Sequence, residues 1–155
     1  IDNRTNQKNA KVIAWECLKH SYRPNSAKLD DVLEVLGDSN NTNACLQHLE
    51  KRLRVIQISE PGKDKIRFAI DPLAEYLAAL HLVDTYTQDK NKWMEFINKA
   101  KSVSDLDAIQ GFLLAVQDCC VTHSEDVPTF VVAALSEFTG VMLEANQQSL
   151  ITPSF

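Results

Sequence analysis

The sequence predicts a mainly α fold, a winged helix of three helices and a β-hairpin followed by a helical bundle or a short α-solenoid. The chain has 155 residues, of which 45% are hydrophobic, so it can bury a core. Only 4 Gly and 5 Pro occur, too few for a many-stranded fold that needs turn signals every ~8–12 residues. Apolar residues follow the helical period over most of the chain and the strand period of two only between residues 55 and 70.

Three short helices are expected before residue 55. The first covers about residues 8–20 and stops at the turn of residues 23–25. Ser26 is positioned to cap a second helix, and Gly37 to end it in the left-handed conformation. The third helix is expected from about Thr42 to Leu53.

A β-hairpin is expected next, because residues 55–58 and 66–70 alternate apolar and polar side chains around a polar loop. Three helices and a hairpin follow one another in the order of a winged helix, whose hairpin is the wing. We therefore assign residues 1–70 to a winged-helix domain.

Residues 71–155 are predicted to form a helical domain. Four helices are expected, at about 71–87, 89–101, 104–122 and 126–146, with Asp71-Pro72 starting the first and Ser104 capping the third. In the first of them, Leu73, Tyr76, Leu77, Leu80 and Val83 form an apolar stripe, and Ala74, Ala78 and Ala79 allow a neighbour to approach closely.

The charge is divided unevenly. Residues 1–70 carry 12 Lys/Arg against 9 Asp/Glu, and residues 71–155 carry 4 against 12. The phosphates of a nucleic acid would repel the acidic second half, so only the first half is a candidate for nucleic-acid binding. No apolar run approaches a membrane span, and four cysteines are too few for a disulfide scaffold. We expect a cytoplasmic protein without membrane contact, excised from a longer chain because it opens on Ile1 without Met.

Catalytic signatures are absent. Neither G-x-x-x-x-G-K-[ST] nor G-x-G-x-x-G occurs, and no G-x-S-x-G or H-E-x-x-H is found. We therefore expect no enzyme activity and no cofactor in this chain.

A repeated Cys-x-x-His is the sharpest metal candidate, formed by Cys17 with His20 and Cys45 with His48. The preferred interpretation is two core cysteines and two surface histidines, without metal. The adjacent Cys119 and Cys120 are expected to be one buried thiol and one thiol at the rim, rather than a redox switch.

A DNA-binding surface is the second candidate site. Amides pair with adenine edges and cations with phosphates, and such residues lie on the third predicted helix and the wing. They are Asn41, Asn43, Gln47, Lys51, Arg52, Arg54, Lys63, Lys65 and Arg67. Glu50, Glu60 and Asp64 interrupt this patch, so a solvated or protein-contacting face is preferred.

The segment of residues 66–79 resembles a motif at the end of the winged helix in NACHT-type STAND NTPases, as found in prokaryotic signalling proteins. The family pattern is roughly Phe-x-His-x-x-(hydrophobic)-x-Glu-(aromatic)-(hydrophobic)-Ala-Ala. The segment's motif residues are Phe68, Ile70, Asp71, Leu73, Glu75, Tyr76, Leu77, Ala78 and Ala79. Ile70 stands where the family has His and cannot donate a hydrogen bond to phosphate. Phe68, Leu73, Tyr76 and Leu77 are expected to pack the wing against the next helix, and Glu75 to need a partner for its charge.

The resemblance implies a nucleotide-binding domain before this chain, holding ATP or ADP and Mg²⁺, on which the winged helix closes. The expected function is therefore a regulatory or interaction region of a larger signalling ATPase, in which rigid-body motion couples the nucleotide domain to downstream helices. Expected partners are that domain in the same protein, and other proteins or further copies of itself. The alternatives are a winged-helix DNA-binding regulator and a helical-repeat protein-binding scaffold.

Overall fold

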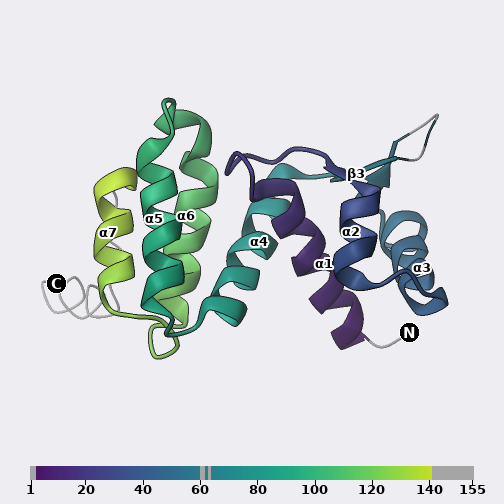
Figure 1. Cartoon of the computed structure of the whole chain (residues 1–155), viewed down its shortest axis with the longest axis horizontal. Coiled ribbons are helices and arrows are strands. Elements are labelled where there is room, and N and C mark those ends of the chain that lie inside the picture. The colour runs from purple at the N-terminus through teal and green to yellow at the C-terminus, as the bar shows by residue number, and fades with distance from the viewer. Residues whose placement is uncertain (1–2, 60–61, 63, 141–155) are drawn as a thin grey trace, which may run out of the picture. The chain divides into compact units, whose positions relative to one another are not determined.

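The computed structural model describes residues 3–59, 62 and 64–140, and 69% of them are helical, which confirms the mainly α prediction. They form two compact units, Ile1–His81 and Leu82–Phe155, which we describe separately. The predicted domain boundary at 70/71 falls at the start of a helix and stays a prediction. The elements are α1 (Asn3–Leu18), β1 (Ala27–Lys28), α2 (Leu29–Leu36), α3 (Asn40–Gln47), the π-helical turn η1 (His48–Arg52), β2 (Ile56–Ile58), β3 (Lys65–Phe68), α4 (Asp71–Tyr86), α5 (Lys90–Ser102), α6 (Leu106–Thr122) and α7 (Phe130–Thr139) (Figure 1).

Helix α2 starts differently from the prediction. Ser26 is not its cap, because Lys28 precedes the helix without a side-chain cap and Ala27–Lys28 pair as a strand instead. Gly37 does end α2 with a positive φ of 90°, but its ψ of 132° lies outside the left-handed helical region. Ala27–Lys28 thus add a strand to the sheet where the sequence predicted the first residues of the helix.

The predicted third helix, Thr42 to Leu53, begins earlier and changes type. Ser39 caps α3, and its Oγ accepts a hydrogen bond from the Thr42 N–H at 3.2 Å. From His48 the α-helix gives way to the π-helical turn η1, which ends as the Leu53 N–H donates to the His48 carbonyl at 3.0 Å. The wider turn rotates the side chains that follow it relative to a continuous α-helix.

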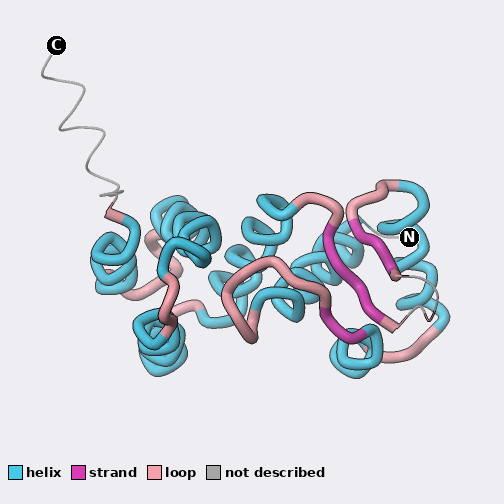
Figure 2. Tube along the Cα trace, turned by 90° about the horizontal axis from the view of Figure 1, so that it is seen from above, coloured by secondary structure: helices cyan, strands magenta, loops and turns pink. Residues whose placement is uncertain are grey.

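The sheet of the first unit has three antiparallel strands in the order β1-β3-β2, drawn in magenta in Figure 2. The predicted pair β2 and β3 is present, with Gln57 opposite Arg67, and β1 was not predicted. On β3, Ile66 and Phe68 are buried and Lys65 and Arg67 are exposed. The buried side chains of the sheet join Ile13 and Leu18 of α1 in the core.

In the second unit, α5, α6 and α7 lie side by side (Figure 1). Trp93, Phe96 and Phe112 are fully buried and meet edge to face, with ring centroids 6.0 and 5.9 Å apart. These rings form the centre of the second core, and the Trp93 indole N–H is satisfied by the Thr87 carbonyl at 2.8 Å.

Two predicted helix boundaries in this unit are wrong. Ser104 does not cap α6, since the helix begins at Leu106 with Asp105 before it and no side-chain cap. The last helix begins at Phe130 rather than residue 126 and ends at Gly140, which adopts the left-handed conformation with φ 71°. The expected continuation to residue 146 and the frayed tail lie outside the described residues.

Helices α6 and α7 are joined by buried polar side chains. The fully buried Gln117 donates to the Ser136 Oγ at 3.3 Å and accepts from the Thr139 hydroxyl at 2.8 Å. The Ser136 hydroxyl in turn donates to the Val132 carbonyl at 2.8 Å. About two turns earlier in α6, Gln110 donates to the Phe138 carbonyl at 2.9 Å. These bonds set the register in which α7 packs on α6.

None of the helices in the described part of the chain combines the length and the apolar character needed to cross a bilayer.

Candidate functional site

The motif segment is built by the end of β3 and the start of α4. Phe68 is buried, with 2% of its surface exposed, whereas Ile70 is 60% exposed in the turn before the helix. The Ile70 carbonyl accepts the Ala74 N–H at 3.3 Å, so the helix already begins at Asp71 rather than after an Asp71 cap. Ile70 therefore presents an apolar side chain to the surface at the position where the family has His.

The packing of α4 agrees with the prediction at its alanines and differs from it at most of its large residues. Ala74, Ala78 and Ala79 are buried, with exposures of 1%, 0% and 0%, whereas Tyr76 is 47% exposed. Of the other residues of the predicted stripe, Leu73, Leu77 and Leu80 are only half-buried, whereas Val83 is buried as expected. Small side chains let neighbouring segments approach the helix backbone, which turns the bulkier residues away from the core. The expectation that Tyr76 packs the wing onto the helix is thus wrong.

Glu75 lies half-buried between these faces. Burial raises the pKa of its carboxyl, and the charge of Asp71 one turn earlier raises it further. No cation of the described residues forms an ion pair with it. The partner expected for Glu75 is therefore not found within the described part of this chain.

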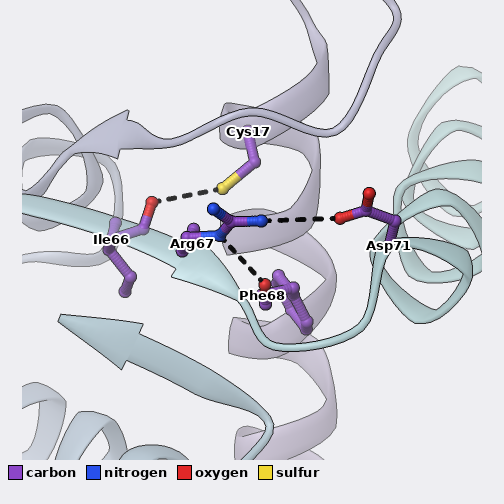
Figure 3. A network of polar contacts seen from close by, with 5 residues as sticks. All are labelled: Cys17, Ile66, Arg67, Phe68 and Asp71. Atoms are coloured by element: carbon purple, nitrogen blue, oxygen red, sulfur yellow. Dashed lines mark hydrogen bonds and ion pairs between the residues drawn. The ribbon is translucent and has the colours of Figure 1, made fainter. Parts of the chain in front are cut away.

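A small polar network ties β3 to its neighbours (Figure 3). The Arg67 Nη2 lies 3.8 Å from the Asp71 Oδ1, and its Nε donates to the Phe68 carbonyl at 3.4 Å. The Cys17 thiol of α1 donates to the Ile66 carbonyl at 3.6 Å, and burial raises its pKa to about 11. Cys17 therefore remains a protonated thiol near neutral pH, and Arg67 links the sheet to the first turn of α4.

The DNA-binding candidates are exposed wherever the structure describes them. These are Asn41, Asn43, Gln47, Lys51, Arg52, Arg54, Lys65 and Arg67, and Lys63 lies outside the described residues. Glu50 points back to the sheet, since its Oε2 accepts the Ile58 N–H at 3.0 Å. Its Oε1 is 3.7 Å from the Lys51 Nζ. The carboxylate thus stabilises the β2 edge as well as interrupting the cationic surface.

The zinc candidates do not assemble into a site. Cys45 is buried and accepts a hydrogen bond from the Asn9 amide at 3.5 Å, while His20 is exposed. Within residues 3–59, 62 and 64–140, no group of three or more His, Cys, Asp or Glu side chains could hold a metal ion.

The adjacent cysteines differ from the expectation of one buried and one rim thiol. Cys119 is 2% exposed and Cys120 is not exposed at all. Burial, and then the neighbouring Cys119, raise the pKa of Cys120 to about 12. Both thiols belong to the core of α6, where the protonated form is favoured.

A hollow on the first unit was missed from the sequence. It lies between the turn before β1 and the sheet, and its polar lining is Asn25, Ser26, Ser59, Lys65 and Arg67. The sequence predicts Ser26 to be a helix cap and Ser59 to be part of the hairpin loop. Nothing in the pattern indicates that the two residues line one hollow. Only the alternation that predicted the strand could have placed Lys65 and Arg67 on one face.

One protein-family model matches the chain. Residues 101–143 match the model described as NACHT C-terminal Helical domain 4, a span that includes α6, α7 and the Gln117 network. No curated protein and no solved structure matches the chain.

Proposed function

Since the chain carries a NACHT-type C-terminal helical region, we propose that it is a non-catalytic regulatory part of a larger NACHT-like signalling ATPase. The match over residues 101–143 carries this proposal. It is supported by the motif of residues 66–79, which resembles the same family and precedes the matched span in the family's order.

The first unit acts as the winged helix in this proposal, with β2 and β3 as the wing. Its order of three helices and an antiparallel pair supports that assignment. The upstream domain binds ATP or ADP with Mg²⁺, and the chain itself holds no cofactor.

Helix α4 is the proposed coupling element. Its residues are divided between the two units, since the boundary falls between His81 and Leu82. Its outer side exposes Tyr76 and the half-buried Leu73 and Leu77, next to the exposed Ile70. This apolar surface contacts the upstream nucleotide domain. At Ile70 the contact is therefore apolar, where the family's His would form a hydrogen bond to the nucleotide. Motion of the nucleotide domain is then transmitted through α4 to the downstream helices. The protein is cytoplasmic in this proposal, and the moved helices bind other proteins or further copies of the chain.

The test uses the parent protein. The roughly 300 residues upstream of Ile1 are expected to contain G-x-x-x-x-G-K-[ST] after a strand. In that protein, Tyr76→Asp is expected to accelerate release of a fluorescent ADP at least several-fold, because it places a charge in an apolar contact. Asp84→Asn, on the same helix but in the second unit, serves as the matched control. Absence of the loop, or unchanged ADP release in Tyr76→Asp, contradicts the proposal.

DNA binding is the second candidate function, favoured by the uniform exposure of the cationic and amide side chains from α3 to β3. A labelled duplex titrated with the 155-residue chain separates the two. Affinity in the micromolar range that falls steeply with salt favours DNA. No binding at low salt removes this function.

The helical-repeat scaffold gains support if the parent continues in helical pairs after Phe155.

A further inference from the structure

The outer face of the three-stranded sheet is cationic. Because β3 buries Ile66, its neighbours Lys65 and Arg67 project from the opposite face. The register sets Lys28 directly across from Lys65, and Gln57 across from Arg67. Like charges directly opposite each other destabilise an antiparallel pair, so this face concentrates positive charge at a cost to the sheet.

A hollow of about 270 Å³ lies over this face. Ser59 borders it, held beside Lys65 by its N–H, which donates to the Lys65 carbonyl at 3.0 Å. Ser26 borders it from the other side, two residues before Lys28 in the extended segment. The lining offers two cations, two hydroxyls and the Asn25 amide, and none of its described residues carries a carboxylate.

The positive charge of the hollow is poorly neutralised. Lys65 makes no ion pair with any described residue. The ion pair of Arg67 is the 3.8 Å contact with Asp71, in which the two side chains are 55% and 58% exposed, a geometry that contributes little. Its Nε donates to the Phe68 carbonyl at 3.4 Å, which carries no negative charge. Lys28 differs, because it lines a neighbouring hollow together with Glu16 and Asp31. The uncompensated charge is therefore that of Lys65 and Arg67.

We infer that this hollow binds a phosphate group, either free phosphate or the phosphate of a small phosphomonoester. The Arg67 guanidinium offers a planar pair of donors to two phosphate oxygens, and the Lys65 ammonium supplies a point charge. The hydroxyls of Ser26 and Ser59 donate to the remaining oxygens. The site is independent of the proposed function, since it needs only the first unit.

The test is a titration of the 15N-labelled 155-residue chain with inorganic phosphate at constant ionic strength, followed by amide chemical shifts. Saturable shifts are expected at Ser26, Ser59 and Arg67, with a dissociation constant on the order of 1 mM. Lys65→Gln is expected to weaken binding about tenfold. The matched control Lys8→Gln removes the same charge from exposed α1 and leaves binding unchanged. All variants keep exposed side chains, and the spectrum itself reports whether they fold.

The variant Asp71→Asn makes the test sharper. It removes the carboxylate that competes for Arg67, so phosphate binding is expected to tighten by up to about fivefold. A general loss of structure or of surface charge would not produce such a gain. Unchanged or weaker binding in Asp71→Asn contradicts the role of Arg67.

Two further ligands distinguish the sources of the phosphate. Equal affinity for AMP and inorganic phosphate identifies the phosphate alone as the ligand, and tighter AMP binding identifies a phosphomonoester. The inference is overturned if phosphate shifts no amide at 20 times the expected constant, or if Lys65→Gln binds as the unchanged chain does. It is also overturned if only duplex DNA shifts these amides, because the surface then serves a polynucleotide.

Discussion

Glu75 is a carboxylate held in surroundings that favour its protonated form. It is half-buried, and Asp71 lies one helical turn before it, so two like charges face each other at i and i+4. Its pKa in the folded chain is therefore raised. A group with a raised folded pKa stabilises the protein below its unfolded pKa, and this contribution is lost as the pH rises through the folded value.

We predict that Glu75→Gln stabilises the chain at pH 7 by about 0.3 kcal/mol, because it removes the carboxyl that faces the like charge of Asp71. The gain disappears below the ordinary carboxyl pKa of 4.5, because the natural side chain is then neutral as well. Urea unfolding at pH 7 and pH 4 measures both values. Glu34→Gln on the exposed side of α2 is the control. A loss of stability at pH 7 would mean that Glu75 has a favourable partner.

At the scale of elements, α4 separates large from small apolar residues. Its alanines are buried and its tyrosine is exposed, so close backbone approach stabilises the helix against its neighbours. A larger residue on the buried side should therefore destabilise the chain, whereas a smaller residue on the exposed side should change its stability little.

Ala78→Leu is expected to destabilise the chain by about 1–3 kcal/mol, because the buried side of α4 has no space for three more carbons. Tyr76→Ala on the outer side is expected to change stability by less than about 0.5 kcal/mol. Thermal unfolding followed by circular dichroism measures both. Similar costs for the two variants would show that Tyr76 is packed in solution.

The buried polar side chains between α6 and α7 allow a second test. Gln117→Ala is expected to cost about 2 kcal/mol, because it removes two hydrogen bonds and leaves a cavity. Gln110→Ala, at the half-buried end of the same interface, is expected to cost about 1 kcal/mol. Urea unfolding compares them. If Gln117→Leu, which preserves volume, costs nothing, the network contributes packing rather than polar specificity.

The sequence predicted the positions of the helices better than which of their side chains are buried. Apolar period located the starts of α2 to α6 to within about three residues, whereas α1 begins five residues before its predicted start and α7 four residues after. The alternation at 55–70 located β2 and β3. Strand β1 was missed because a strand of two residues, Ala27 and Lys28, is too short to show an alternation. The burial of Ala78 agrees with the close approach that its small side chain predicted. Tyr76 was expected to be packed and is exposed, since a period identifies the apolar positions but not how closely another segment approaches them.

The same limit applies to the candidate sites. Residue type predicted that the cationic and amide side chains of α3 and β3 would be exposed. The hollow beside Lys65 depends on Ser26 and Ser59, which are distant in sequence and meet only through strand register. The family resemblance drawn from residues 66–79 is confirmed by the match at 101–143, and the coupling role stays a proposal.

At the scale of the whole molecule, each compact unit contains one tryptophan, Trp15 in the first and Trp93 in the second. Each unit has its own buried core. The two cores are therefore open to separate observation by fluorescence.

We predict that a substitution in one core shifts only the unfolding reported from that core. In a Trp15→Phe background, Gln117→Ala is expected to lower the urea midpoint reported by Trp93. In a Trp93→Phe background, the same substitution leaves the Trp15 midpoint unchanged, because distant independent sites do not couple. Equal shifts of both midpoints would show that the chain unfolds as a single cooperative unit.

The order β1-β3-β2 also affects how the chain behaves at high concentration. The two outer strands are only two and three residues long, and the longest strand is enclosed between them. Sheet edges with unpaired backbone groups are templates on which other chains add strands and start fibrils. Such short edges offer few of these groups, and the lysine of β1 disfavours addition of a further strand. The sheet that carries the cationic hollow is thereby protected against aggregation through its own edges.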